Sequence, residues 1–203
     1  IPSGNLNKKE AMNFSFFLFS FGSVLCIQLS NTAIFIGVFL SMPLLIIYSI
    51  HLKRQPLIGN FTVSLIIGLS FLFCGAAFNN ISPLWIPSLL SFGLTLIREI
   101  VKDIADINGD KSVGYQTFPI KYGIDKTLKL IFIISLIVGL FAIYPYGFNL
   151  YSFWYVIIVI IGIEIPLIVV VFLLLTKPIN SSAILSAKIL KFSSIMGLLA
   201  IYI

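Results

Sequence analysis

The sequence predicts an all-α membrane protein: a polytopic bundle of seven transmembrane helices in a single domain covering residues 1–203. Of the 203 residues, 59% are hydrophobic and only 10% are charged, and the mean hydropathy is +1.11. A soluble domain carries about 25% charged residues, so this chain has too little polar surface to cover a globule in water. Its apolar residues also form long runs, each near the ~20 residues with which a helix crosses a bilayer.

Seven apolar segments are long enough to form these spans. Because backbone groups in hydrocarbon must satisfy their own hydrogen bonds, and because the segments lack the alternation of barrel strands, we expect helices. Pro43, Pro87 and Pro166 fall inside spans and are expected to bend them. The expected spans are Met12–Gln28, Thr32–Ile50, Phe61–Phe78, Pro83–Val101, Thr127–Tyr144, Phe153–Thr176 and Ala183–Tyr202.

The connections between the expected spans alternate in charge. Three of them, at 29–31, 79–82 and 145–152, are short and uncharged. Every Lys and Arg lies in the remaining segments or in the helix ends next to them, and the positive-inside rule makes this the cytoplasmic face. The net charge of +6 is therefore a signal of topology in a lipid bilayer, and we do not expect a nucleic-acid partner. The charged segments are 1–11, 51–60, 98–126 and 177–182.

Four acids crowd one stretch of the charged face. If the fourth span continues as a helix through this stretch, their spacings of four, three and four residues place them in a stripe roughly 60° wide. Asn108-Gly109 offers an earlier helix end, which would put the last acid on the following turn. The four acids are Glu99, Asp103, Asp106 and Asp110.

Like charges at these spacings repel one another, so something must offset the repulsion. One explanation is a solvated helix end in which Arg98, Lys102 and Lys111 form ion pairs with the acids. The other is a divalent cation. Mg²⁺ binds a few carboxylates and fills its octahedron with water and substrate phosphate oxygens, so an acidic helix end that faces a membrane cavity suits a diphosphate held through metal.

A second polar cluster surrounds the loop at 51–60, where Tyr48 precedes the adjacent cations Lys53 and Arg54. Two cations with a nearby phenol suit a phosphate partner, although anchoring at a positive-inside face would also account for them. Tyr115 flanks the acidic stretch in a similar way, and its alternative role is loop packing.

Glu164 is the acid that lies away from the charged face, near the middle of the sixth span. Intramembrane acids are costly and are functional candidates, although a protonated carboxyl bonded to a neighbouring helix is an alternative. A transporter would use such an acid for coupling. The absence of an internal repeat and the one-sided acidic cluster weigh against transport.

The charged segments resemble those of UbiA-type intramembrane prenyltransferases. The stretch Arg98–Gly123 is similar to the family's second Asp-rich motif, and Tyr48–Arg54 with the following Gly59-Asn60 is similar to its Tyr/Lys-Arg loop. Ile1–Gly4 resembles the segment that follows the first Asp-rich motif. The resemblance implies nine transmembrane helices around a central cavity, of which these seven would be the third to the ninth. It also implies an N-terminally truncated chain without the first motif, which we expect to be inactive alone.

The resemblance further implies Mg²⁺-dependent prenyl transfer from an isoprenoid diphosphate through an allylic carbocation. The three aspartates of the motif would hold Mg²⁺ and the diphosphate and so count as catalytic and metal-binding, although Ala105 stands where relatives often carry an acid. The remaining expected site residues would bind substrate. The aspartates are Asp103, Asp106 and Asp110, and the substrate-binding residues are Tyr48, Lys53, Arg54, Arg98, Lys102 and Tyr115.

Among the subfamilies, Arg98–Asp103 and Gln116–Ile120 look most like geranylgeranylglycerol-phosphate geranylgeranyltransferases. This implies transfer of a geranylgeranyl group to geranylgeranylglyceryl phosphate in membrane ether-lipid biosynthesis. Members that prenylate an aromatic acceptor for quinone biosynthesis share much of the pattern and are the alternative.

Overall fold

The computed structural model describes residues 7–177 and 180–202. Within these ranges the chain is helical, without strands, and six helices are long and apolar enough to cross a membrane. Their positions agree closely with six of the expected spans, which confirms an all-α bundle of membrane-type helices. The six run Asn31–Ile50, Ile58–Ala77, Ser82–Ala105, Ile124–Gly147, Phe153–Thr176 and Asn180–Tyr202.

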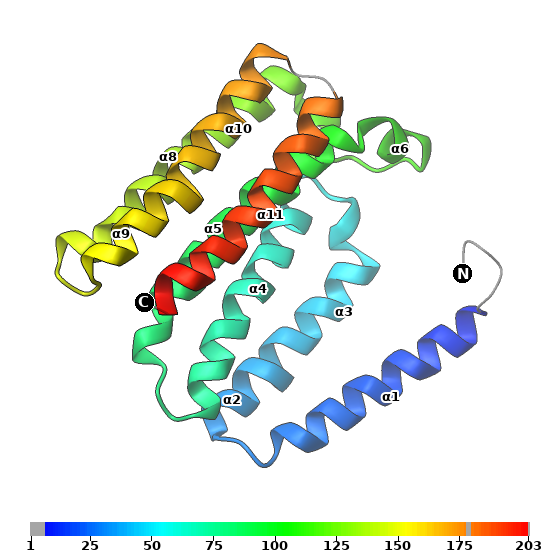
Figure 1. The fold of residues 1–203 in the computed structure, drawn as a ribbon. Helices are drawn as coiled ribbons and strands as arrows, with labels where there is room; N and C mark the ends of the chain where they lie inside the picture. Colours follow the sequence, from blue (N-terminus) through cyan, green and yellow to red (C-terminus); the bar gives the residue numbers. More distant parts are fainter. Residues whose placement is uncertain (1–6, 178–179, 203) are drawn as a thin grey trace.

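The first expected span, Met12–Gln28, forms helix α1 (Lys8–Cys26), which is not one of the six. Three charged residues open this helix, and they lower its apolar character. Figure 1 shows that α1 diverges from the other helices with increasing distance from the turn that joins it to α2. Near that turn it still contacts the next span, where Ser23 Oγ lies 3.3 Å from Met42 Sδ. The predicted number of seven spans is therefore not confirmed.

Two of the spans contain a π-helical segment just before a proline. Pro43 and Pro166 each stand in the first two positions of the α-helix that follows such a segment. A π-helical turn accommodates a wider backbone within an otherwise regular helix, so these two prolines lie where the helical geometry changes. Pro87 instead lies in the first turn of its helix, where a proline is readily accommodated. The segments are α2 (Asn31–Ile34), η1 (Phe35–Ser41) and α3 (Met42–Ile50), then α9 (Phe153–Val159), η4 (Ile160–Glu164) and α10 (Ile165–Thr176).

Helices α4 (Ile58–Ala77) and α5 (Trp85–Ala105) pack closely through small residues. A Cβ on Gly68 would lie 3.0 Å from the carbonyl oxygen of Ser88, and the Ser88 hydroxyl donates a 2.9 Å hydrogen bond to the Gly68 carbonyl. Small residues at membrane helix interfaces allow this close approach and leave room for such interhelical bonds. The turn η3 (Ser82–Leu84) connects the pair.

The larger apolar core lies between α5 and the helices that follow it. Buried side chains of α5, α8 (Ile124–Gly147), the α9–α10 span and α11 (Asn180–Tyr202) form one cluster. The Tyr155 hydroxyl donates a 2.7 Å hydrogen bond to the Ala142 carbonyl inside this core. A smaller cluster joins α2 and η1 to α4. The outward faces carry many exposed Phe, Ile and Leu side chains, as expected for helices in lipid.

The connections sort to opposite ends of the bundle. In Figure 1 the turns α1–α2, α4–α5 and α8–α9 lie at the lower-left ends of the helices that they join, whereas α6 (Ile107–Ser112) and the α3–α4 connection lie at the upper-right ends. The short helices η2 (Leu52–Arg54) and α7 (Phe118–Tyr122) belong to the connections of this second end. The charged connections therefore meet at one end of the bundle, where the candidate site lies.

Candidate active site

A polar pocket of about 150 Å³ opens at the charged end of the bundle. Its walls come from the end of α3, from η2 and α4, from the end of α5, and from the segment between α5 and α7. The pocket thus joins the two polar clusters that lie some fifty residues apart in the sequence. The lining residues are Tyr48, Lys53, Gln55, Gly59, Asn60, Val63, Glu99, Lys102, Asp103, Asp106, Asp110, Tyr115 and Thr117.

The acidic stretch is not one continuous helix. Helix α5 ends at Ala105, Asp106 adopts φ −99° and ψ 8°, and α6 begins at the next residue. The expectation of a helix that runs on to Asn108-Gly109 is therefore wrong, because the chain turns in the bridge region at Asp106. The Asp110 amide still donates a 2.9 Å hydrogen bond to the Asp106 carbonyl, so the turn keeps both acids at the pocket.

Gly59 allows the cationic turn to lie against the start of α4. A Cβ at this position would lie 2.9 Å from the carbonyl oxygen of Leu52, which is closer than side chains normally approach. Leu57 adopts a positive φ of 63° just before α4 and helps to reverse the chain. Together these features bring Lys53 into the wall of the pocket, opposite the acids of α5.

Asn60 holds the carboxylate of Asp103 across the α4–α5 interface. Its Nδ2 donates a hydrogen bond of 3.0 Å to Asp103 Oδ2, and the Asn60 side chain is buried. A hydrogen bond to an ionised group is stronger than a neutral one, especially where little water competes. The bond leaves the second oxygen of Asp103 available for another partner in the pocket.

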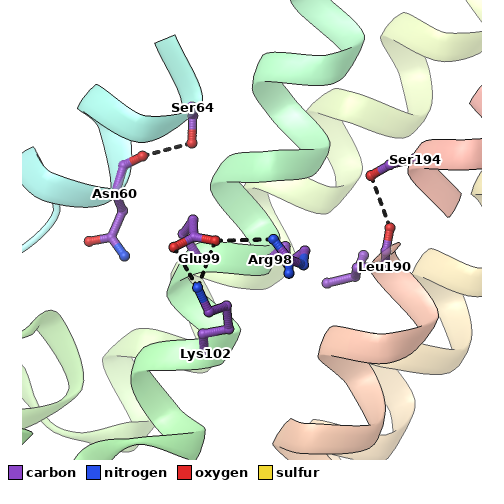
Figure 2. A network of polar contacts seen from close by, with 7 residues as sticks. All are labelled: Asn60, Ser64, Arg98, Glu99, Lys102, Leu190 and Ser194. Atoms are coloured by element: carbon purple, nitrogen blue, oxygen red, sulfur yellow. Dashed lines mark hydrogen bonds and ion pairs between the residues drawn. The ribbon is translucent and has the colours of Figure 1, made fainter. Parts of the chain in front are cut away.

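Glu99 forms the ion pairs of the acidic stretch (Figure 2). Its Oε2 lies 3.0 Å from Lys102 Nζ, and its Oε1 accepts hydrogen bonds from Lys102 Nζ at 3.1 Å and from Arg98 Nη1 at 3.2 Å. No ion pair within residues 7–177 and 180–202 involves the three motif aspartates. The explanation by a salt-bridged helix end therefore accounts for Glu99 and not for the aspartates.

The aspartates create a site suited to a cation. Burial raises the pKa of the Asp110 carboxyl, and the nearby Asp106 carboxylate raises it further. Over the part of the chain that the structure describes, no three His, Cys, Asp or Glu side chains lie close enough to hold a metal ion together. Mg²⁺ commonly binds one or two carboxylates and takes its other ligands from water and phosphate, so the oxygen donors present fit that smaller share of its coordination shell.

Most of the predicted site residues meet in the pocket. The exceptions are Arg54 and Arg98, which do not line it. The Arg54 guanidinium instead lies 6.0 Å from the ring centroid of Tyr115. The backbone carbonyl of Arg54 accepts a 3.2 Å hydrogen bond from the Gln116 amide. Arg54 therefore joins the two loops that carry the site. The predicted residues that do line it are Tyr48, Lys53, Lys102, Asp103, Asp106, Asp110 and Tyr115.

Several pocket residues were not predicted as site residues. Asn60 had a signal, because it closes the loop that carries the cations Lys53 and Arg54, whereas Gln55, Val63 and Thr117 belong to no such pattern. Thr117 Oγ1 is buried, lines the pocket and lies near enough to the Asp110 carboxyl to lower its pKa, although it makes no hydrogen bond of regular geometry among the described residues. A buried polar atom left unpaired in a pocket is a position where a ligand or water can bind.

Glu164 lies away from this pocket. It lines a separate apolar hollow of about 420 Å³ between α8 and the η4–α10 segment. A Cβ on Gly139 would lie 2.7 Å from Glu164 Oε2, so this glycine makes room for the carboxyl group. Glu164 Oε1 is buried without a hydrogen-bond partner in the described chain, and any functional role of the residue stays a prediction.

The fold is that of an integral membrane helix bundle, with a polar pocket lined by acids and lysines at one end. The sequence profile described as the UbiA prenyltransferase family matches residues 1–195, and the chain belongs to that family. The resemblance of the acidic motif is therefore confirmed, and the transporter alternative finds no support.

Relatives from several organisms carry the name digeranylgeranylglyceryl phosphate synthase. The protein from Methanosphaera stadtmanae is 38% identical over 164 residues, which are 80% of this chain and 59% of that protein. The one from Sulfurisphaera tokodaii is 38% identical over 191 residues, with 90% and 65% covered, and the one from Methanosarcina barkeri is 32% identical over 202 residues, with 98% and 68% covered. The chain thus spans roughly two thirds or less of these relatives' length.

A solved structure described as giving structural and mechanistic insights into digeranylgeranylglyceryl phosphate synthase in membranes is also similar. It matches with a TM-score of 0.84 and 34% identity, over 99% of this chain and 71% of that one. The arrangement of helices is therefore that of a membrane protein of the same family.

Proposed function

We propose that the full-length gene product transfers a prenyl group from an isoprenoid diphosphate to a lipid acceptor, with the polar pocket as the donor site. The observation that carries the proposal is the meeting of Lys53 and Lys102 with Asp103, Asp106 and Asp110 at the end of an apolar bundle. A diphosphate needs cations and metal-binding oxygens, and its prenyl chain needs an apolar wall. The family membership and the names of the relatives support this reading.

Different pocket residues contribute different interactions with the diphosphate. Lys53 and Lys102 stabilise the negative charge that grows on the leaving group as the bond from its oxygen to the first prenyl carbon breaks. One or two carboxylates among Asp103, Asp106 and Asp110 would hold Mg²⁺, and the bound ion would neutralise part of that charge. Asn60 keeps the Asp103 carboxylate in place through their 3.0 Å bond. The acceptor oxygen then bonds to the allylic carbon and loses its proton.

The apolar helices protect the reacting carbon. An allylic carbocation reacts rapidly with water. The bond between the prenyl group and the diphosphate must therefore break where water is scarce. The membrane spans next to the pocket supply such walls, and we propose that the complete fold has the nine helices of the family around a central cavity. We propose that the charged end faces the cytoplasm, as the positive-inside rule predicts, and that the pocket opens on that side.

The proposed donor is geranylgeranyl diphosphate, and the proposed acceptor is geranylgeranylglyceryl phosphate. The name shared by the relatives supports this choice over an aromatic acceptor of quinone biosynthesis. We also propose that these 203 residues do not transfer the prenyl group without the first Asp-rich motif, which is not among them.

The test is an acceptor competition with the full-length gene product in liposomes. With Mg²⁺ and geranylgeranyl diphosphate, geranylgeranylglyceryl phosphate and an aromatic acid are offered in separate and in mixed reactions. We expect the diether phosphate as the product wherever geranylgeranylglyceryl phosphate is offered, alone or together with the aromatic acid. Product formed only from the aromatic acid would overturn the proposed acceptor, and no product from either would overturn the proposed function.

A further inference from the structure

Arg98 lies in a membrane span but does not line the polar pocket. Around the axis of α5, at ~100° per residue, Arg98 lies about 80° from Asp106 and about 140° from Asp103. Asp103 faces α4, where Asn60 binds it, so Arg98 lies at the opposite edge of the polar stripe. A charged side chain in a membrane span is costly and calls for a partner.

The guanidinium of Arg98 reaches toward α11, which packs against α5. Figure 2 shows it on the side of α5 that faces Leu190 and Ser194 of α11. Its Nη1 donates to Glu99 at 3.2 Å, whereas its buried Nε has no hydrogen-bond partner among the described residues. The side chain is 33% exposed. Because a guanidinium carries five N–H donors, most of its donors remain available to a ligand.

Glu99 connects this arginine to the donor pocket. Its single carboxylate is shared between Arg98 and Lys102, and of these two cations only Lys102 lines the pocket. One negative charge divided between two cations leaves the trio with a net positive charge. The trio therefore carries two neighbouring positive groups, with Lys102 on the pocket side and Arg98 on the α11 side.

We propose that Arg98 binds the anionic head group of the acceptor, a phosphate monoester or a carboxylate. The inference rests on the proposed function, since transfer requires the acceptor oxygen to come within ~3–3.5 Å of the donor carbon. The acceptor head must then lie beside the diphosphate without sharing its cations, because two anions in one pocket repel. The planar fork of a guanidinium matches both anions with paired hydrogen bonds.

The experiment compares acceptors with and without the charge. The full-length gene product and its Arg98→Gln variant are assayed in liposomes with geranylgeranylglyceryl phosphate and with the uncharged alcohol geranylgeranylglycerol. An aromatic acid forms a third arm, which separates a carboxylate from a phosphate as the source of the anion. We expect Arg98→Gln to raise KM for the phosphate acceptor about 10- to 100-fold, as the loss of charge-assisted hydrogen bonds predicts. KM for the alcohol and for the donor should not change.

Activity toward the alcohol also reports folding of the variant. If Arg98→Gln does not fold, Arg98→Lys serves instead, and it should raise KM selectively for the charged acceptor because the fork is lost. An equal loss with both acceptors would overturn the proposal, because the arginine would then act on the fold alone. A raised donor KM would also overturn it, because Arg98 would then belong to the diphosphate site.

Failure of the proposed function gives a different pattern. In that case the wild-type protein transfers nothing to any acceptor. Direct binding of the phosphate acceptor, measured by thermophoresis, then decides the role of Arg98. Weaker binding by Arg98→Gln than by wild type would support the anion site, and equal binding would overturn it.

Discussion

Replacing Asn60 by alanine should slow catalysis through Asp103. The substitution removes the 3.0 Å bond from Nδ2 to Asp103 Oδ2 and leaves the rest of the pocket intact. The carboxylate then loses the partner that fixes its orientation between α4 and α5. Because this carboxylate is proposed to hold the metal that faces the diphosphate, its misplacement should weaken the stabilisation of the leaving group.

The expected loss of rate follows from the charge of Asp103, which accepts the hydrogen bond from Asn60. Hydrogen bonds to ionised groups contribute about 1.5–3 kcal/mol, and each ~1.4 kcal/mol corresponds to a factor of ten in rate. Asn60→Ala should therefore lower kcat by about 10- to 150-fold if the whole interaction is used in the transition state. The Mg²⁺ concentration that gives half-maximal activity should rise at the same time.

The assay is steady-state prenyl transfer by the full-length gene product over a range of Mg²⁺ concentrations. Thr62→Ala is the matched control, because Thr62 is also buried on the same helix, its hydroxyl donates to the Ile58 carbonyl, and it does not line the pocket. We expect the control to keep nearly full activity. A wild-type rate and Mg²⁺ requirement in Asn60→Ala would refute the role given to this bond.

Three further substitutions test other parts of the account. Gly59→Ala should destabilise the protein by about 1–3 kcal/mol, seen as a lower midpoint of thermal unfolding in detergent, whereas Gly109→Ala has open space and should unfold like wild type. Lys53→Gln should raise the donor KM about 10- to 100-fold through one lost charge-assisted contact, whereas exposed Lys121→Gln should not; equal KM values in both variants would count against the pocket. Glu164→Gln should leave the rate of prenyl transfer unchanged. A variant that no longer transferred the prenyl group would require a role for the apolar hollow that Glu164 lines.

The spans could be predicted closely because the length and the hydropathy of an apolar run are enough to identify a membrane helix. The span Phe153–Thr176 has the bounds expected of it, and the neighbouring helices differ by only a few residues at their ends. The π-helical segments before Pro43 and Pro166 could not be placed, since a change of hydrogen-bond register depends on how neighbouring helices pack. The first expected span is not among the six membrane-type helices for a different reason, because charged residues open helix α1 and make it less apolar.

The site was predictable where residue chemistry alone was enough. The acids and Lys53 meet in one pocket because both clusters lie on connections at the charged end. The break at Asp106 was not foreseen, because Asn108-Gly109 carries the stronger helix-ending signal and yet lies within α6. The bond between Asn60 and Asp103 joins residues far apart in sequence, so only the packing of α4 on α5 reveals it.

Arg98 and Arg54 show why charge alone does not define a pocket. Both were expected to bind substrate, and neither lines the donor pocket. Rotation by one residue along α5 moves Arg98 to a different face from Glu99. Arg54 lies beside Lys53 in the sequence but lies near the ring of Tyr115 instead. Adjacent cations therefore have different surroundings, which depend on the local backbone.

Binding of the donor tests the central claim most directly. The measurement is equilibrium binding of radiolabelled geranylgeranyl thiolodiphosphate, a slowly reacting donor analogue, to the full-length gene product with Mg²⁺ and with EDTA. We predict binding that requires Mg²⁺ and that Asp106→Asn weakens by at least about tenfold, as expected for the loss of a charged ligand. Equal binding with Mg²⁺ and with EDTA, or undiminished binding by Asp106→Asn, would contradict the assignment of this pocket as a metal-dependent diphosphate site.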